Sequence, residues 1–210
     1  GEERFSSLHV RSLGVKVKHM NIITNALGHQ LYNAGGASRR PEKATKLFYE
    51  AAAKYEEALR SNPNDWETLL NCAECWYKIY QFQESKGRSI SNVVLDARHP
   101  IASQIEQYYF RAIKAAGVQP FVRYKYARFL SRCGPTRMDK AEAQYLRALE
   151  VAPNDPVILV SYATFLRCDR HDSLTADAFD LRSVKVRKIL HEAGQNKTKF
   201  RSQPSSSSIF

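Results

Sequence analysis

Cysteine and histidine are the residues of this chain whose types most readily support metal or redox chemistry. Two of the four cysteines form Cys72-Ala-Glu-Cys75, and the others are Cys133 and Cys168. A Cys-x-x-Cys pair supplies half of a zinc site or one redox couple, but zinc needs four ligands and a thioredoxin-like couple needs a βαβ setting. The six histidines are scattered without ligand-like spacing. We therefore expect structural thiols, with no metal and no cofactor.

Sequence motifs of enzymes are also missing. The chain has no Gly-rich phosphate loop, no G-x-S-x-G elbow and no H-E-x-x-H pair. Neighbouring carboxylates such as Glu56 and Glu57 fit a solvated helix face, which needs no acid–base role. No 18-residue apolar run exists and the N-terminus lacks the apolar centre of a signal peptide. We expect a cytoplasmic protein that binds rather than catalyses, and the abrupt start suggests a part of a longer protein.

Two stretches, Tyr49–Asp65 and Ala141–Asp155, repeat one pattern and predict the helices that would position any binding residues. Each has a small residue, an aromatic residue four positions later, an alanine three further on and a proline five beyond that. The members are Ala51, Tyr55, Ala58 and Pro63 in one copy, and Ala141, Tyr145, Ala148 and Pro153 in the other. Small residues let a neighbouring helix approach closely, and the proline ends the helix.

A second motif occurs four times and supplies the other helix of each pair. It reads Leu27-Gly28-x-x-Leu31, Cys72-Ala73-x-x-Trp76, Tyr126-Ala127-x-x-Leu130 and Tyr162-Ala163-x-x-Leu166. Together the two motifs resemble the tetratricopeptide repeat, whose regular period is 34 residues. The resemblance implies an all-α, right-handed superhelical stack of about four helical hairpins with a C-terminal capping helix. Stacks of this kind usually bind proteins.

The motif positions divide the chain into an N-terminal extension at 1–20, a repeat domain at 21–194 and a flexible, Ser-rich basic tail at 195–210. Repeats are expected near 21–65, 66–119, 120–155 and 156–194. We expect Leu174, Ala178, Leu181, Ile189 and Leu190 to form the face of the capping helix that packs on the last repeat. The insertion Glu84–Pro100 contains Val93, Val94 and Leu95, which are too apolar to stay bare, so we expect it to dock.

In tetratricopeptide arrays the first helix of each pair lines the concave side, so the resemblance places the candidate partner-binding residues there. They are His29, Asn71, Tyr77, Lys78, Tyr124, Lys125, Arg128, Arg132 and Arg167. Aromatic rings give stiff contact area and guanidinium groups grip carboxylates, which suits a partner segment of acidic character. Alternatively, the arginines are only solvated and the tyrosines pack between the layers, or the groove is filled by the chain's own insertion or tail.

One sub-family of these arrays holds the C-terminal carboxylates of chaperones, and its clamp residues can be compared with this chain. Its first-repeat positions fall on Asn25 and His29, which do not match. Its second-repeat position falls on Asn71, which matches. The third-repeat positions fall on Phe121, which fails, and Lys125, which lacks the bidentate geometry of arginine. We therefore expect a ligand other than a chaperone tail.

The net charge of +11 raises an alternative function in RNA association. Tyr126–Phe129 and Arg147–Pro153 partly resemble the half-a-TPR repeats of RNA-processing assemblies. The candidates for contacting nucleic acid or another anionic surface lie in the densest basic stretch: Arg182, Lys185, Arg187, Lys188, Lys197, Lys199 and Arg201. Direct nucleic-acid binding requires such residues to form one stripe.

Overall fold

The computed structural model describes residues 22–85, 95–96 and 98–201, with the side chains of 194–201 excepted, and every regular element in these ranges is helical. The prediction of an all-α helical stack is therefore confirmed. Residues 22–37 form the first helix. The others are α2 (Pro41–Ser61), α3 (Trp66–Ser85), α4 (Pro100–Ala116), α5 (Pro120–Ser131), a 3-10 turn η2 (Pro135–Arg137), α6 (Met138–Val151), α7 (Pro156–Asp169) and α8 (Ser173–Arg201).

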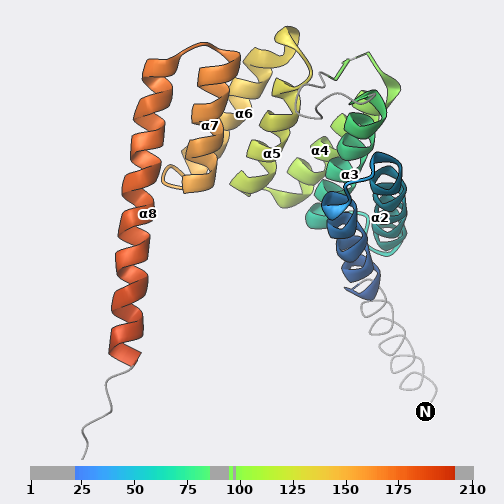
Figure 1. The fold of residues 1–210 in the computed structure, drawn as a ribbon, viewed down its shortest axis with the longest axis horizontal. Helices are drawn as coiled ribbons and strands as arrows, with labels where there is room; N and C mark the ends of the chain where they lie inside the picture. The colour runs from blue at the N-terminus through green and yellow to red at the C-terminus, as the bar shows by residue number, and fades with distance from the viewer. Residues whose placement is uncertain (1–21, 86–94, 97, 202–210) are drawn as a thin grey trace, which may run out of the picture.

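Consecutive helices form antiparallel hairpins, and the hairpins stack side by side into an arch (Figure 1). Helix α3 packs along both α2 and α4, α5 packs along α6, and α7 packs along α8. Helix α4 packs less extensively against α5, and α7 packs less extensively against both α5 and α6. Helix 22–37 and α8 form the two legs of the arch and extend to the same side (Figure 1).

Proline and capping residues set the starts of the helices. Proline occupies the first turn of α2, α4, α5 and α7, where its missing N–H group costs no hydrogen bond. Before α7, Asp155 Oδ1 accepts hydrogen bonds from the N–H groups of Val157 and Ile158, at 2.8 and 3.1 Å. Asp155 is therefore a typical N-cap residue, because its side chain accepts hydrogen bonds from backbone N–H groups that have no partner within the helix.

Small residues allow the close approach of the helices. Ala58 is 3% exposed, and Ala73, Ala127 and Ala148 are fully buried, as the repeat pattern requires. At the first hairpin the approach is closer still, because a Cβ atom placed on Gly28 would lie 2.7 Å from a ring carbon of Tyr55. The small positions therefore lie where helix meets helix.

Aromatic triads join successive hairpins and recur 36 residues apart. Tyr109 packs against Tyr126 at 5.2 Å between ring centroids and against Phe129 at 5.3 Å. The next triad consists of Tyr145, Tyr162 and Phe165, with the corresponding distances 5.4 and 5.3 Å. The near-identical distances show that the α4–α5 and α6–α7 interfaces pack in the same way.

Helix α8 does not pack as its large apolar residues predict. Leu174 is 84% exposed, Leu181 56%, Ile189 63% and Leu190 58%, and Ala178 is also exposed, so the predicted packing face is wrong. The face on α7 is instead built on Ala176 and Ser183, both fully buried. Their spacing of seven residues equals that of Ala141 and Ala148, and Phe179 adds a ring that meets Tyr162 edge to face at 4.9 Å between centroids.

The first helix shows a similar inversion, and the insertion docks. In the first helix Leu27, a bulky member of the second motif, is 43% exposed and Ile23 is 56% exposed, because Gly28 and Gly35 lie against the rings of Tyr55 and Phe48 in α2. In the insertion, Leu95 is buried and donates its backbone N–H to the carbonyl oxygen of Arg132 at 2.7 Å. Val93 and Val94 lie outside the described residues.

The predicted terminal segments fall largely outside the described residues, which begin at 22 and end at 201. Helix α8 continues to Arg201 and therefore passes the predicted start of the tail at 195. Its 29 residues are about twice the 14 of α7, so the second half of α8 extends beyond its partner (Figure 1).

Candidate functional site

A cavity of about 780 Å³ opens on the side of the stack lined by the first helices of the hairpins. We call it the concave groove. Helices α3, α5 and α7 supply most of its walls, and Arg187 reaches it from α8. Five basic residues and two acidic ones line it: Lys78, Lys125, Arg128, Arg132 and Arg187, and Glu74 and Asp169. The described lining therefore carries excess positive charge.

Six of the nine residues predicted to bind a partner line this groove. They are Tyr77, Lys78, Tyr124, Lys125, Arg128 and Arg132, all from α3 and α5 or the residue that follows α5. The arrangement follows from helix periodicity, since residues three or four apart share a helix face. The sequence register thus brought these six side chains to one surface.

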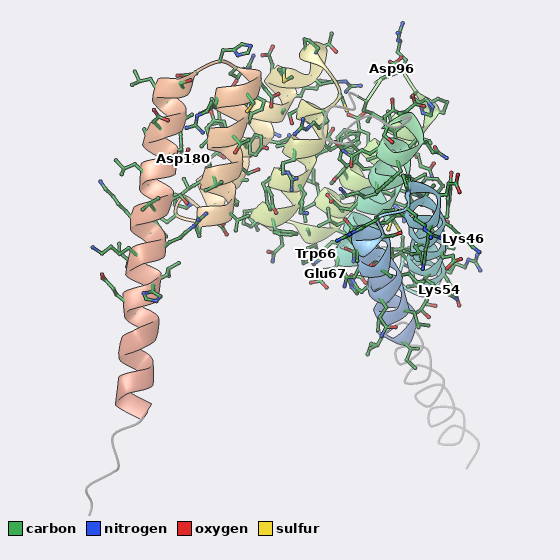
Figure 2. The ribbon with its side chains drawn as sticks, in the orientation of Figure 1. Lys46, Lys54, Trp66, Glu67, Asp96 and Asp180 are labelled. Carbon is green, nitrogen blue, oxygen red and sulfur yellow. The ribbon has the colours of Figure 1, made fainter. Side chains whose placement is uncertain are left out.

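The other three predicted residues lie away from the groove lining. His29 is exposed, and its Nδ1 atom is 3.0 Å from the hydroxyl of Tyr55. Asn71 is half-buried on α3. Arg167 forms ion pairs with Asp177 and Asp180 of α8, at 2.6 and 2.8 Å, and so links α7 to the last helix. Figure 2 labels Asp180 on the part of α8 that runs beside α7.

Glu74 lies at the centre of the basic residues of the groove. Its carboxylate accepts a hydrogen bond from the hydroxyl of Tyr109 at 2.9 Å and pairs with Lys125 Nζ at 3.5 Å. Burial lowers the pKa of Lys78, and the nearby Arg128 and Lys125 lower it further against the opposing effect of Glu74. One carboxylate thus faces several cations, and an anionic ligand would reduce their mutual repulsion.

Aromatic rings border this basic cluster. Phe121, 44% exposed, meets Tyr124 edge to face at 5.0 Å between centroids. Lys125 Nζ lies over both rings, at 5.5 and 5.9 Å. Burial raises the pKa of Tyr124, so its hydroxyl stays protonated and able to donate a hydrogen bond at neutral pH. The border combines apolar contact area with polar groups that can orient a ligand.

Gln81 is a groove residue that the sequence did not reveal. It is 7% exposed, and its buried Oε1 atom has no hydrogen-bond partner within the described part of the chain. A buried acceptor without a donor is costly, and a ligand N–H group would satisfy it. Gln81 lies four residues after Tyr77 and three after Lys78 on α3, so the same helix face contained the signal.

The basic residues assigned to nucleic acid or an anionic surface all belong to α8. Arg182 donates to Asn154 Oδ1 at 2.9 Å, whereas Arg187 lines the concave groove. Lys185 and Lys188 are exposed. Lys197, Lys199 and Arg201 lie on the helical backbone, and their side chains are outside the described set. Arg182 and Arg187 therefore point to different parts of the stack, toward Asn154 and toward the groove respectively.

The cysteine pair of the sequence lies in the core. Cys72 and Cys75 are fully buried, and burial raises the pKa of both thiols far above the usual range. Cys133 is buried as well, and Cys168 is exposed. Within the described ranges no group of three or more His, Cys, Asp or Glu side chains could hold a metal ion. Over the same ranges, no helix has the length and apolar character needed to cross a bilayer.

Comparison with known proteins gives little beyond this geometry. No protein-family model and no curated protein matches the sequence. Among solved structures, the chain is similar to one described as the crystal structure of MamA, with 17% sequence identity and a TM-score of 0.38. The match covers 72% of this chain and 95% of that one. Membership of the tetratricopeptide family is a prediction from the motifs.

Proposed function

We propose that the chain is a protein–protein interaction scaffold that binds an extended segment of a partner, acidic in character, in its concave groove. The observation that carries the proposal is the excess of basic side chains around Glu74, within a groove bordered by aromatic rings. Positive charge selects acidic side chains, and the rings supply contact area at low entropic cost.

The unsatisfied Gln81 Oε1 atom adds a reason to favour an extended peptide. An extended backbone presents N–H groups that are not used within the peptide itself, and one of them can donate to this oxygen. Acidic side chains of the same peptide would then reach Lys78 and Arg128, which also line the groove. The groove thus offers both a backbone contact and side-chain contacts.

Selection from a random peptide library tests this proposal. The full chain should enrich peptides rich in Asp and Glu, and the double variant Arg128→Glu with Arg132→Glu should lose them. A matched control is Arg60→Glu with Arg147→Glu, which makes the same change in net charge at two exposed sites outside the groove lining. Equal loss in the control would mean that overall charge, not the groove, binds the peptides.

RNA association by the basic residues of α8 is the rival. Deleting residues 182–210 should abolish RNA binding, and such binding should weaken steeply with salt. Peptide binding in the groove should survive in part, reduced by the loss of Arg187 and of the packing of Ser183 against α7. Enrichment of RNA together with no peptide enrichment would favour the rival.

A further inference from the structure

The second half of α8 has properties that neither stack packing nor groove binding explains. Residues 187–193 are all exposed, and the helix there extends beyond the stack (Figure 1). Within it, Val186, Ile189, Leu190 and Ala193 follow the spacing i, i+3, i+4, i+7, so they share one face of the helix. Ile189 and Leu190 leave 63% and 58% of their surface in solvent. Beyond the half-buried Val186, this apolar stripe has no cover among the described residues.

Basic residues border the stripe on both sides. At 3.6 residues per turn, Lys185 lies beside Ile189 on one edge, and Arg187 lies beside Leu190 on the other. From Arg182 to Arg201 the sequence has seven Lys or Arg residues and one acid, Glu192. A helix with an apolar face and a basic polar face is typical of segments that lie in the interface of an anionic lipid surface.

We propose that the distal part of α8 docks on an anionic lipid surface, with Ile189 and Leu190 facing the acyl boundary and Lys185 near the headgroups, while Lys188 on the opposite face of the helix adds to its positive charge. The charge of the helix is complementary to such a surface. The stripe argues against RNA as the main ligand, because phosphate contacts need no exposed aliphatic side chains.

The arrangement of the two legs favours a flat ligand over a groove in a partner protein. Helix 22–37 extends to the same side of the arch as α8 (Figure 1). Its described residues start with Ile22 and Ile23, which are 67% and 56% exposed, and residues 22–37 include no Asp, Glu, Lys or Arg. A bilayer surface can contact both legs at once, whereas a groove that encloses one helix cannot.

Sedimentation of the full chain with lipid vesicles tests this inference. Vesicles of phosphatidylcholine with phosphatidylserine should bind the chain, and vesicles of phosphatidylcholine alone should not. The pair Ile189→Ser with Leu190→Ser should reduce binding roughly tenfold, because serine removes the apolar surface without altering charge. Lys185→Glu with Lys188→Glu should reduce it at least as much, and more at low salt.

Controls separate this docking from other effects. Leu174→Ser removes an apolar side chain that is 84% exposed at the opposite end of α8, and it should bind vesicles like the wild type. Circular dichroism should show unchanged helix content in every variant. Arg128→Glu with Arg132→Glu should retain vesicle binding within about twofold, so failure of the groove proposal does not decide this one.

The overturning outcomes are distinct. If the chain does not bind vesicles that contain phosphatidylserine, the proposal is wrong. Binding that survives the Ile189→Ser and Leu190→Ser changes would reduce it to unspecific charge attraction. Binding of poly(U) RNA by the wild type and the serine pair alike, without vesicle binding, would assign the basic residues of α8 to nucleic acid instead.

Discussion

Glu106 of α4 accepts a hydrogen bond from the hydroxyl of Tyr126 in α5 at 2.8 Å, and this contact joins the α3–α4 hairpin to the α5–α6 hairpin. Glu142 and Tyr162 repeat this contact at 3.2 Å in the next interface, again 20 residues apart. Glu56 accepts from Trp76 Nε1 at 3.1 Å with the same separation. The stack is therefore held by one recurring carboxylate–aromatic contact as well as by small residues.

Removing the hydroxyl in Tyr126→Phe should destabilise the stack by about 1–3 kcal/mol, because the half-buried Glu106 loses a donor while keeping its ion pair with Arg137. Urea unfolding followed by circular dichroism measures this change. The control Tyr49→Phe removes the hydroxyl of an exposed ring that receives a bond from Gln83 and should have a much smaller effect. Equal losses in both variants would contradict the role of the interface contact.

Gly28 and Gly36 should respond in opposite ways to alanine. Gly28→Ala places a methyl group 2.7 Å from the Tyr55 ring, so we expect a loss of about 1–3 kcal/mol. Gly36 is helical with nothing within 4 Å of its would-be Cβ, so Gly36→Ala should gain about 0.5–1 kcal/mol. Thermal unfolding of the two variants should therefore shift in opposite directions, and a shared direction would contradict the close contact of the first hairpin.

Stability should fall in alkaline solution. Burial, reinforced by Glu142, raises the pKa of Tyr162 from 10.0 to about 12, so the folded state favours the protonated hydroxyl. The contribution of this hydroxyl to the free energy of unfolding is complete below pH 10 and is lost as the pH rises toward 12. The free energy of unfolding of Tyr162→Phe should depend less steeply on pH in this window than that of the wild type. Parallel curves would contradict this prediction.

The four thiols should differ sharply in reactivity. Cys168 is exposed, whereas Cys72, Cys75 and Cys133 are buried, and burial raises the pKa of Cys133 to about 12. Ellman's reagent should therefore modify one thiol rapidly in the native chain and the other three only after unfolding. Cys168→Ser should remove the rapid phase. Rapid loss of two or more thiols from the native wild type would contradict the buried position of at least one of Cys72, Cys75 and Cys133.

The fold could be predicted from the sequence because small residues, prolines and aromatic residues recur at fixed spacing in each repeat. Helix α2 spans Pro41–Ser61, as its proline start and Pro-Asn-Asp end indicate. The predicted packing face of α8 was wrong because it relied mainly on large apolar residues, whereas the fully buried residues of this contact are Ala176 and Ser183. A search for small residues seven apart would have found the true contact face.

The candidate site was predictable only in part. Helix register brings Tyr77, Lys78 and Arg128 to the groove, since each lies on the first helix of its hairpin. The pairing of Arg167 with two aspartates of α8 depends on how the last helix packs, which local spacing does not determine. Arg187 enters the groove for the same reason.

Hydrogen–deuterium exchange with a selected acidic peptide tests the central claim, that the concave groove binds the partner, most directly. Peptide binding should slow exchange in the groove helices α3, α5 and α7, and Arg128→Glu with Arg132→Glu should abolish this protection. Protection confined to α2, α4 and α6, with no change in α5 and α7, would contradict the account.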